Sequence, residues 1–341
     1  MTRVHQVLSG AGPYDAVTSQ ALAWRELVGG TVYAEALEPR VRGIEVVDGL
    51  EPRQDDVLVI HYSAYAPRVR RLLEAPCRKL LVYHNVTPPR YLWRHHPLVA
   101  VQCSLGRAQL PTYARAAHVA AAVSAFNAAE LEEAGAREVR VIPILLDPVQ
   151  LEARGSPPPG EGPLVLCVGR LAPHKRHDLV IRAFAAWQRA HAPDGRLVCV
   201  GEPLSEGYRR LLEEVALTSG ARNVSLAGGL PQRDLNASYA SADVLLSLSE
   251  HEGFCVPLLE AFHFGVPVVA QPAGGMPEVG GDAVLWTDPD PTVAAELIEL
   301  ALRDGELRAE LARRGRERLD EYAPERTAAK VRAAVDAVIG S

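Results

Sequence analysis

Short runs of β-branched and leucine residues alternate with helix-like stretches along almost the whole chain. The runs are Val4–Leu8, Thr31–Glu35, Ile44–Val47, Val57–Ile60, Leu80–Tyr83, Val119–Val123 and Val139–Ile142, then Leu164–Val168, Arg196–Val200, Val224–Leu226, Val244–Leu248 and Val266–Ala270. Strands separated by helical segments pair in parallel, and the connecting helices cover the sheet. The pattern therefore predicts an α/β protein built from doubly wound parallel sheets.

A stretch rich in proline and glycine divides the chain. Residues 155–162 read Gly-Ser-Pro-Pro-Pro-Gly-Glu-Gly, and three successive prolines make a stiff linker. The 341 residues are enough for two domains, each with its own core. We expect one Rossmann-like domain over residues 1–154 and another over 163–321. A cleft between the carboxyl ends of their sheets would be the place where such folds bind ligands.

Composition excludes several classes of protein. With 48% hydrophobic and 23% charged residues the chain is globular, and its net charge of -6 argues against general nucleic-acid binding. No apolar run reaches the length of a membrane span, and Met1-Thr2-Arg3-Val4 leads into a strand pattern instead of a signal peptide. The five cysteines include no CxxC pair, which indicates reduced thiols and neither a disulfide framework nor a zinc site. We expect a cytoplasmic protein.

The stretch Ser249–Val269 has features of a ligand site. A polar loop that contains Glu252 leads to Pro257, which suits the first position of a helix, and Glu260 follows in that helix. A helix start presents unpaired N–H groups and the positive end of the helix dipole to an anion such as a phosphate. The two glutamates would then hold hydroxyl groups on either side of the anion. A buried turn with two incidental carboxylates explains the same residues equally well.

Two cations, Arg170 and Lys175, follow the strand expected at Leu164–Val168. Arginine offers a planar fork that suits phosphate oxygens, and lysine offers a compact charge. Taken singly, either residue is more often a solvated surface charge. Beside an anion site on a neighbouring loop of the same domain, the two would clamp a diphosphate.

Polar residues also stand at strand ends in the first half of the chain. His61 and His84 follow two expected strands, and this position favours a ligand-facing role more for His84 than for His61. Asp15 follows the first strand and either caps the next helix or touches a substrate.

Other patterns carry less information. Asp288-Pro-Asp290 has the form of a metal-binding DxD pattern, but it lies in a turn before a helix, where capping explains it. The chain has no GxGxxG fingerprint, P-loop, GxSxG elbow or HExxH motif. Between residues 57 and 129 the sequence contains one acidic residue, Glu74. The basic residues in the same stretch are Arg68, Arg70, Arg71, Arg78, Lys79, Arg90, Arg94, Arg107 and Arg115. A solvated face explains part of this bias, and an anionic acceptor or a membrane surface would explain the rest.

Two segments resemble a known family. Gly169–Phe184, GRLAPHKRHDLVIRAF, and Ser249–Ala270, SEHEGFCVPLLEAFHFGVPVVA, are similar to the retaining GT-B glycosyltransferases of glycosyltransferase family 4. The spacing from Glu252 to Glu260 reproduces the EX7E signature of that family. The resemblance covers residues 163–321, and in the first half it rests on short motifs such as HNVTPP, which begins at His84.

The resemblance implies a role for each matching residue. Arg170 and Lys175 would bind the diphosphate of a nucleotide-sugar donor, Glu252 the hydroxyl groups of the sugar, and Glu260 those of the ribose. The donor would also be lined by Gly253, Phe254, Cys255 and Val256. The catalytic set would be His84, Arg170, Lys175 and Glu252. The acceptor side would include Asp15, His61 and Asn85.

Two further points follow from the resemblance. Cys255 stands where the family usually has glycine, so the backbone there would not approach the donor as closely. The final helix, within residues 325–341, would cross back to the first domain.

We therefore expect a metal-independent retaining glycosyltransferase without a cofactor, which moves a hexosyl-type sugar from a nucleotide-sugar donor to an acceptor hydroxyl. Arg170, Lys175 and the helix start would stabilise the leaving diphosphate. The acceptor would be anionic or lipid-linked, and the protein would meet the inner face of a membrane without a transmembrane segment and without a nucleic-acid partner. The alternatives are a sugar-nucleotide epimerase or a phosphorylase of the same fold, and a non-catalytic protein that binds nucleotide sugars.

Overall fold

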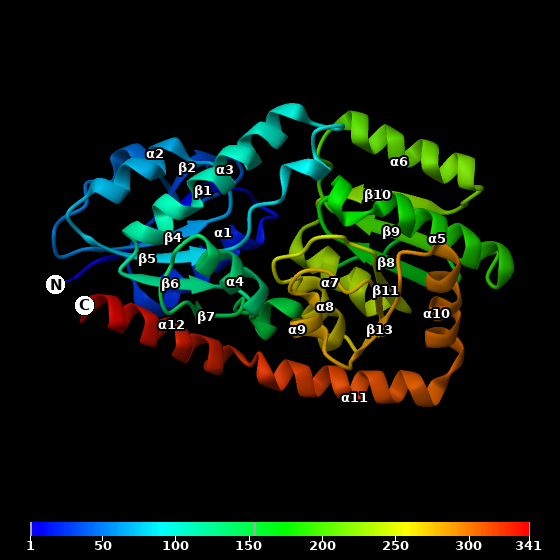
Figure 1. The fold of residues 1–341 in the computed structure, drawn as a ribbon. Helices are drawn as coiled ribbons and strands as arrows, with labels where there is room; N and C mark the ends of the chain where they lie inside the picture. Colours follow the sequence, from blue (N-terminus) through cyan, green and yellow to red (C-terminus); the bar gives the residue numbers. More distant parts are fainter. Residues whose placement is uncertain (1, 153–154, 341) are drawn as a thin grey trace. The chain divides into compact units, whose positions relative to one another are not determined.

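The computed structural model describes residues 2–152 and 155–340, so the expected domain limits at residues 1, 154 and 341 lie outside the described part. The chain divides into two compact units (Figure 1). The first comprises Met1–Trp93, Pro97–Leu145 and Tyr322–Ser341, and the second comprises Arg94–His96 and Leu146–Glu321. No helix within the described residues is long and apolar enough to cross a membrane.

The first unit contains a parallel sheet of seven strands in the order β3-β2-β1-β4-β5-β6-β7. The strands are β1 (Val4–Ala11), β2 (Val32–Leu37), β3 (Glu45–Val46), β4 (Val57–Tyr62), β5 (Arg78–Tyr83), β6 (Val119–Ala122) and β7 (Arg140–Val141). Every run that the sequence indicated in this half forms a strand. The central strands are buried on both faces, as expected of a sheet covered by helices on both sides.

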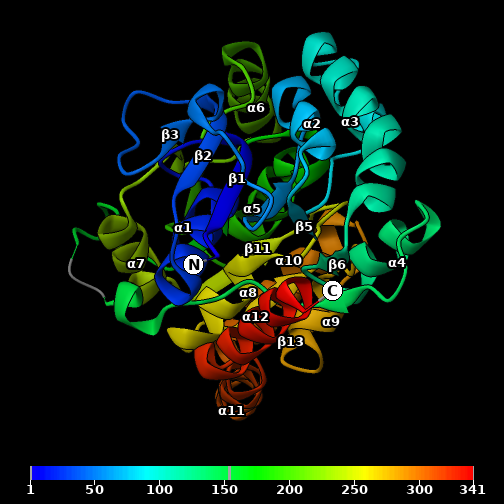
Figure 2. The same ribbon diagram turned by 90° about the vertical axis from the view of Figure 1, so that its left-hand side faces the viewer.

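Two hydrophobic clusters lie on opposite faces of this sheet. The helices of the unit are α1 (Ala16–Val28), α2 (Pro67–Arg71), α3 (Pro97–Ala116), α4 (Ala125–Glu133) and α12 (Pro324–Ile339). Helices α1 and α12 pack on one face, where Trp24 and Val331 meet Val59 and Leu80. Helices α2, α3 and α4 lie on the other face (Figure 2), and their side chains contribute to the other cluster. The unit is therefore doubly wound, as the sequence predicted.

The second unit contains a parallel sheet of six strands in the order β10-β9-β8-β11-β12-β13. The strands are β8 (Leu164–Val168), β9 (Arg196–Val200), β10 (Val224–Gly228), β11 (Val244–Ser247), β12 (Val268–Ala270) and β13 (Val284–Trp286). Strand β13 was not among the strands predicted from the sequence. The strand order reverses between β8 and β11, because the chain builds outwards first on one side of β8 and then on the other.

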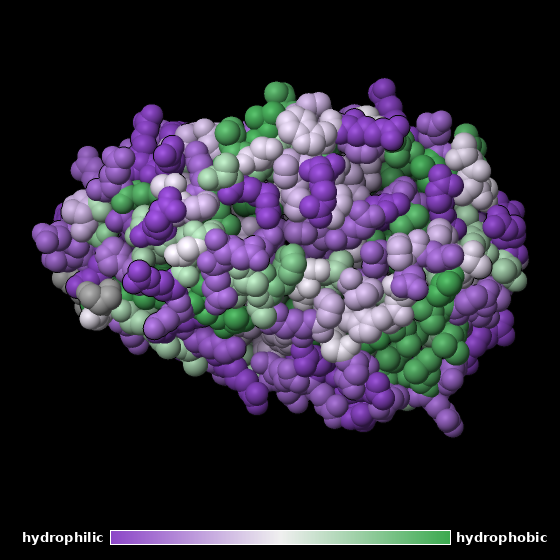
Figure 3. Space-filling model, in the orientation of Figure 1, coloured by the Kyte–Doolittle hydropathy of each residue, from purple (hydrophilic) through white to green (hydrophobic). Residues whose placement is uncertain are grey.

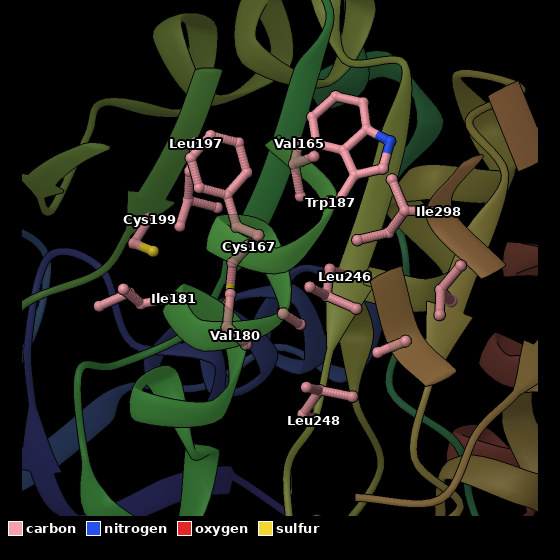
Figure 4. Packing of buried hydrophobic residues seen from close by; sticks show 14 of the residues in the cluster. Val165, Cys167, Val180, Ile181, Trp187, Leu197, Cys199, Leu246, Leu248 and Ile298 are labelled. Carbon is pink, nitrogen blue, oxygen red and sulfur yellow. The ribbon is translucent and has the colours of Figure 1, made fainter. Parts of the chain in front are cut away.

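Seven helices within the described residues belong to this unit: α5 (His177–Ala190), α6 (Glu206–Ser219), α7 (Gln232–Ser241), α8 (Val256–His263), α9 (Met276–Gly280), α10 (Pro291–Arg303) and α11 (Gly305–Glu321). Helices α5, α6 and α10 contribute to one buried cluster with β8, β9 and β11 (Figure 4). Trp187 of α5 is completely buried there, and its indole N–H donates to Glu299 at 3.0 Å. Asp290 caps α10 by accepting hydrogen bonds from two backbone N–H groups, which confirms the capping explanation of Asp288-Pro-Asp290.

The division of the chain falls at Leu145 and Leu146, ahead of the stretch 155–162 that the sequence indicated as a linker. Hydrogen bonds explain why residues 146–152 and the stretch 155–162 belong to the second unit. The Asn236 amide donates to the carbonyl groups of Gln150 and Glu152 at 2.7 and 3.0 Å. The Arg196 guanidinium donates to the carbonyl groups of two of the three prolines. The proline-rich stretch is thus held on the surface of the second unit by a side chain of β9.

Candidate functional site

The point where the strand order reverses defines the candidate site of the second unit. In open α/β sheets, ligands bind at the carboxyl ends of the strands on either side of such a reversal. Here the two strands are β8 and β11, which pair directly. Residues 169–175 follow β8, and residues 248–255 follow β11. The Glu250 N–H donates to the His174 carbonyl at 2.8 Å and ties the two loops together.

Two glycines set the path of the loop after β8. Gly169 has a φ of +147° and donates its N–H to Val200. A Cβ on Gly201 would lie 2.1 Å from the Gly169 carbonyl oxygen, so only glycine fits there. The loop then continues through hydrogen bonds between Leu171 and residues 202 and 204. This close backbone crossing holds the segment that carries Arg170 and Lys175 against the end of β9.

Lys175 and Glu252 form a direct ion pair in this site. The Lys175 ammonium donates to both carboxylate oxygens of Glu252, at 2.6 and 2.7 Å. The side chains are only 19% and 8% exposed. Burial lowers the pKa of Lys175, but the Glu252 carboxylate, together with Cys255 and Cys167, outweighs this effect, so the pKa lies above its ordinary value. The lysine is therefore charged and pre-positioned by a glutamate that the sequence assigned to a separate task.

Two further glycines, Gly274 and Gly275, contact the backbone carbonyl group of Glu252. The Gly275 N–H donates to the Glu252 carbonyl at 2.9 Å. Gly274 has a φ of +57°, and a Cβ there would lie 2.0 Å from the same carbonyl oxygen. The Gly274-Gly275 pair therefore permits a close approach that any larger residue would prevent.

Helix α8 starts beside this ion pair. The helix begins at Val256, so Pro257 occupies its second position. The sequence had predicted the first position for this proline. The missing N–H of Pro257 still has no consequence, because the first four N–H groups of a helix lack internal partners. Cys255 precedes the helix with a φ of 78°, a left-handed conformation that is unfavourable for any residue with a Cβ. This conformation explains why the family that the sequence resembles usually has glycine at the position of Cys255.

Glu260 is buried within α8 and hydrogen-bonded to Tyr239 of α7. The Tyr239 hydroxyl donates to Glu260 at 2.8 Å, and its ring stacks on Phe264. Burial raises the pKa of Glu260 above its ordinary value of 4.5, and hydrogen bonds from Tyr239 and Gln232 only partly oppose this shift. Nothing in the sequence connected Tyr239 with Glu260, because only the fold brings α7 beside α8.

The raised pKa of Glu260 has a consequence for stability. Between 4.5 and its higher folded-state pKa, the folded protein binds more protons at this carboxyl than the unfolded chain does. The contribution of Glu260 to the free energy of unfolding therefore falls as the pH rises through that window. We predict that Glu260→Gln removes this slope, as measured by urea unfolding at a series of pH values. Glu214→Gln, at an exposed site on α6, should leave the slope unchanged, and a slope that survives Glu260→Gln would contradict the assignment.

Arg170 and Arg176 differ in their partners. Arg170 is exposed and makes no hydrogen bond or ion pair with any residue in 2–152 or 155–340. Arg176, which the sequence analysis did not single out, forms ion pairs with Asp178 and Glu250. Glu250 thus pairs with an arginine that directly precedes α5, whereas Arg170 is available to an anion.

His84 and His61 lie together in the first unit. His61 Nδ1 lies 2.9 Å from His84 Nε2, and His61 Nε2 lies 2.9 Å from the Gln6 amide oxygen. Burial lowers the pKa of His84 to about 3 and that of His61 well below its ordinary value. Both rings are therefore neutral near pH 7. His61 is completely buried with both ring nitrogens occupied, so it reaches a ligand only through His84.

Asn85 and Asp15 hold the backbone near their strands. Asn85 has a φ of 79°, and its amide donates to Asn127 and Glu130 at 2.9 and 3.0 Å. Glu130 also accepts from Tyr83 and Arg107, so one carboxylate organises the loop after β5. Asp15 caps α1 by accepting from the N–H of residue 18 at 2.9 Å. The contacts to an acceptor that we expected of these residues stay a prediction.

Comparison with known proteins gives this geometry a context. Residues 150–318 match the family described as glycosyl transferases group 1. A GDP-mannose-dependent alpha-(1-6)-phosphatidylinositol monomannoside mannosyltransferase of Mycolicibacterium smegmatis is 36% identical over 141 residues, which are 39% of this chain and 36% of the relative. A D-inositol 3-phosphate glycosyltransferase of Salinispora arenicola is 34% identical over 178 residues, 50% of this chain and 40% of the relative. The chain thus matches less than half of the length of these relatives.

Solved structures show a similar fold over the whole chain. HepE of Anabaena, in complex with UDP and glucose, has a TM-score of 0.76 at 17% identity and covers 98% of this chain and 99% of its own. WaaG, a glycosyltransferase involved in lipopolysaccharide biosynthesis, has a TM-score of 0.69 at 19% identity and covers 95% and 98%. The fold is therefore that of the GT-B glycosyltransferases, which confirms the predicted fold class.

Proposed function

We propose that this protein is a retaining glycosyltransferase that takes its sugar from a nucleotide-sugar donor and does not require a metal ion. The observation that carries the proposal is the convergence of Arg170, Lys175, Glu252 and the start of α8 at the strand reversal of the second unit. The exposed Arg170, the charged Lys175 and the N–H groups of α8 are complementary to a diphosphate. The names of the relatives support the same class of donor.

Each side chain has a task in the proposed reaction. The bond between the sugar and the diphosphate breaks, and the negative charge that grows on the leaving diphosphate is stabilised by Arg170, Lys175 and the helix dipole. Glu252 binds hydroxyl groups of the sugar, and Glu260 binds those of the ribose. Gly253, Phe254, Cys255 and Val256 line the donor. The acceptor hydroxyl attacks on the face from which the diphosphate leaves, and the departing phosphate takes its proton.

The first unit contributes His84 to the donor sugar in this proposal. Asp15 follows β1 and Asn85 follows β5, two strands that flank β4 in the sheet, and both residues are proposed to face the acceptor. His61 acts behind His84, because it is buried with both nitrogens hydrogen-bonded.

The test is a product analysis with donors labelled in the sugar, UDP-glucose and GDP-mannose, in the presence of a bacterial lipid extract. A transferase yields a labelled glycoside and the free nucleoside diphosphate, with the anomeric configuration of the donor retained and with activity that survives EDTA. A phosphorylase would turn over a glycoside with inorganic phosphate and need no nucleotide. An epimerase would change the sugar without releasing a glycoside, and binding without any product would favour a non-catalytic protein.

We also propose that the acceptor is carried by an anionic membrane surface. Helix α3 exposes an apolar stripe, Leu98, Val101 and Leu105, at helical spacing, with Leu98 74% exposed. Figure 3 shows hydrophobic atoms along the edge where Figure 1 places α3. Of the basic residues in this unit, Arg68 and Arg107 pair with carboxylates, whereas Arg115 of α3 is exposed and forms no ion pair within the described residues. An apolar stripe beside exposed cations is the pattern of a helix that lies at a membrane interface.

Binding to vesicles checks this part of the proposal. We predict sedimentation with phosphatidylglycerol vesicles, weaker sedimentation with phosphatidylcholine, and weakening by salt. The double change Leu98→Gln and Leu105→Gln should weaken binding by roughly tenfold or more, because each side chain loses its burial in the apolar interface. Leu217→Gln is the matched control, because Leu217 is 80% exposed on α6. Equal binding by both variants, or no preference for the anionic lipid, would overturn the membrane proposal.

A further inference from the structure

Three polar side chains form a continuous hydrogen-bonded row in the first unit. Gln6 lies on β1, His61 on β4 and His84 directly after β5, so the row crosses three adjacent strands. Gln6 and His61 are completely buried. Both links of the row measure 2.9 Å. Buried polar groups that are linked in this way polarise one another and favour one arrangement of protons.

The row determines which nitrogen of each ring carries the proton. The Gln6 amide oxygen only accepts, so His61 Nε2 must carry a hydrogen. Because burial keeps His61 neutral, its Nδ1 has a free lone pair and accepts from His84 Nε2. His84 is neutral as well, so its proton is on Nε2 and its Nδ1 keeps a lone pair.

Packing holds the middle ring in place. The Trp24 ring meets His61 edge to face at a centroid distance of 5.4 Å, and the His84 ring lies on another side at 5.2 Å. Rotation of His61 would break both hydrogen bonds inside a dry core, where an unpaired polar group costs about 1–3 kcal/mol. His84 Nδ1, in contrast, makes no hydrogen bond to any residue in the described ranges.

We propose that Gln6 and His61 are positioning residues that hold His84 as the Nε2–H tautomer and so make His84 Nδ1 an acceptor. The ligand group that meets His84 must then be a donor, and the class of ligand is one that presents a hydroxyl group, such as a sugar. The inference rests on the proposed function for the identity of that ligand. The tautomer itself follows from the ligand-free protein alone.

The first arm of the test reads the tautomers directly. Long-range nitrogen–proton correlation spectra of the wild-type protein with labelled histidines distinguish Nε2–H rings from Nδ1–H rings. The measurement uses the wild-type protein, so it does not depend on the folding of any variant. We expect both His61 and His84 to be neutral Nε2–H tautomers at pH 7. An Nδ1–H signal at His84 would overturn the proposal. Because no substrate is present, this arm stands or falls independently of the proposed function.

The second arm measures binding of UDP-glucose against UDP, or of GDP-mannose against GDP if that donor binds. Gln6→Met removes the acceptor at the start of the row. The affinity for the nucleotide sugar should fall by roughly tenfold, the value of one hydrogen bond, while the affinity for the free nucleotide is unchanged. His5→Gln is the matched control, since the buried side chain of His5 on β1 meets Tyr33 and Asp56, which lie outside the row. Equal losses for sugar nucleotide and free nucleotide, no loss, or the same loss in His5→Gln would each overturn the positioning role.

Discussion

Replacing Lys175 with methionine should abolish most of the activity and also destabilise the second unit. The substitution leaves the Glu252 carboxylate, 8% exposed, without its counter-charge. Breaking a buried ion pair in this way costs about 3–5 kcal/mol. The lost charge also faces the proposed diphosphate, so turnover should fall at least about 100-fold, as for removal of one preorganised group that stabilises a transition state. Urea unfolding and the rate of nucleoside diphosphate release give the two readouts.

A double variant separates the two effects of Lys175. Lys175→Met with Glu252→Gln removes both charges, so stability should return to within about 1 kcal/mol of the wild type, because a neutral pair of similar volume has no unpaired buried charge. Turnover should stay low. Arg189→Met, at an exposed cation of α5, is the matched control and should change neither quantity. A Lys175→Met protein with wild-type turnover would contradict the role that we assign to the ion pair.

Gly274→Ala should be among the most damaging single-methyl changes in the chain. The new Cβ would lie 2.0 Å from the Glu252 carbonyl oxygen, and the residue has a φ of +57°. The left-handed conformation alone costs about 1–2 kcal/mol, and forcing the backbone of Glu252 away adds about 1–3 kcal/mol. Because the displaced residue is the partner of Lys175, the affinity for the donor should fall together with the stability. Thermal unfolding and donor titration measure the two losses.

Gly265→Ala is the control for Gly274→Ala. Gly265 has a φ of +67°, but a Cβ there meets no atom within 4 Å. The Gly265→Ala protein should therefore lose only the stability that corresponds to the left-handed conformation, about 1–2 kcal/mol, and its affinity for the donor should not change. Equal losses of stability and of donor affinity in the two variants would contradict the prediction that the contact between Gly274 and Glu252 holds the donor site in place.

Periodicity was sufficient to predict most of the strands, but it is less informative where helix-breaking residues lie inside a helix. Helix α3 contains Gly106 and Pro111, so the sequence offered no continuous helical pattern. Tertiary packing explains Gly106. A Cβ there would lie 3.1 Å from the backbone nitrogen of Tyr65, and the Gly106 carbonyl accepts a hydrogen bond of 2.6 Å from Tyr62. Strand β13 has 3 residues and was not predicted, although β12, of the same length, was.

The candidate site shows the same limit. The positions of Arg170, Lys175, Glu252 and Glu260 could be read from strand ends and from the family motif. Their partners could not, because Lys175 and Glu252 are 77 residues apart and no periodicity links them. The row that starts at Gln6 was invisible for the same reason, since it joins residues 55 and 23 positions apart. Only the folded sheet brings such side chains within hydrogen-bonding distance.

The most direct measurement is a calorimetric titration of the wild-type protein and Arg170→Ala with UDP-glucose and GDP-mannose. The proposed diphosphate site predicts that the wild type binds one of them in a one-to-one complex. Arg170→Ala should weaken this complex by about tenfold or more, because it removes a charged hydrogen-bond donor without breaking any hydrogen bond or ion pair inside the described structure. Absence of binding to either nucleotide sugar, or an affinity that is the same in Arg170→Ala, would contradict it.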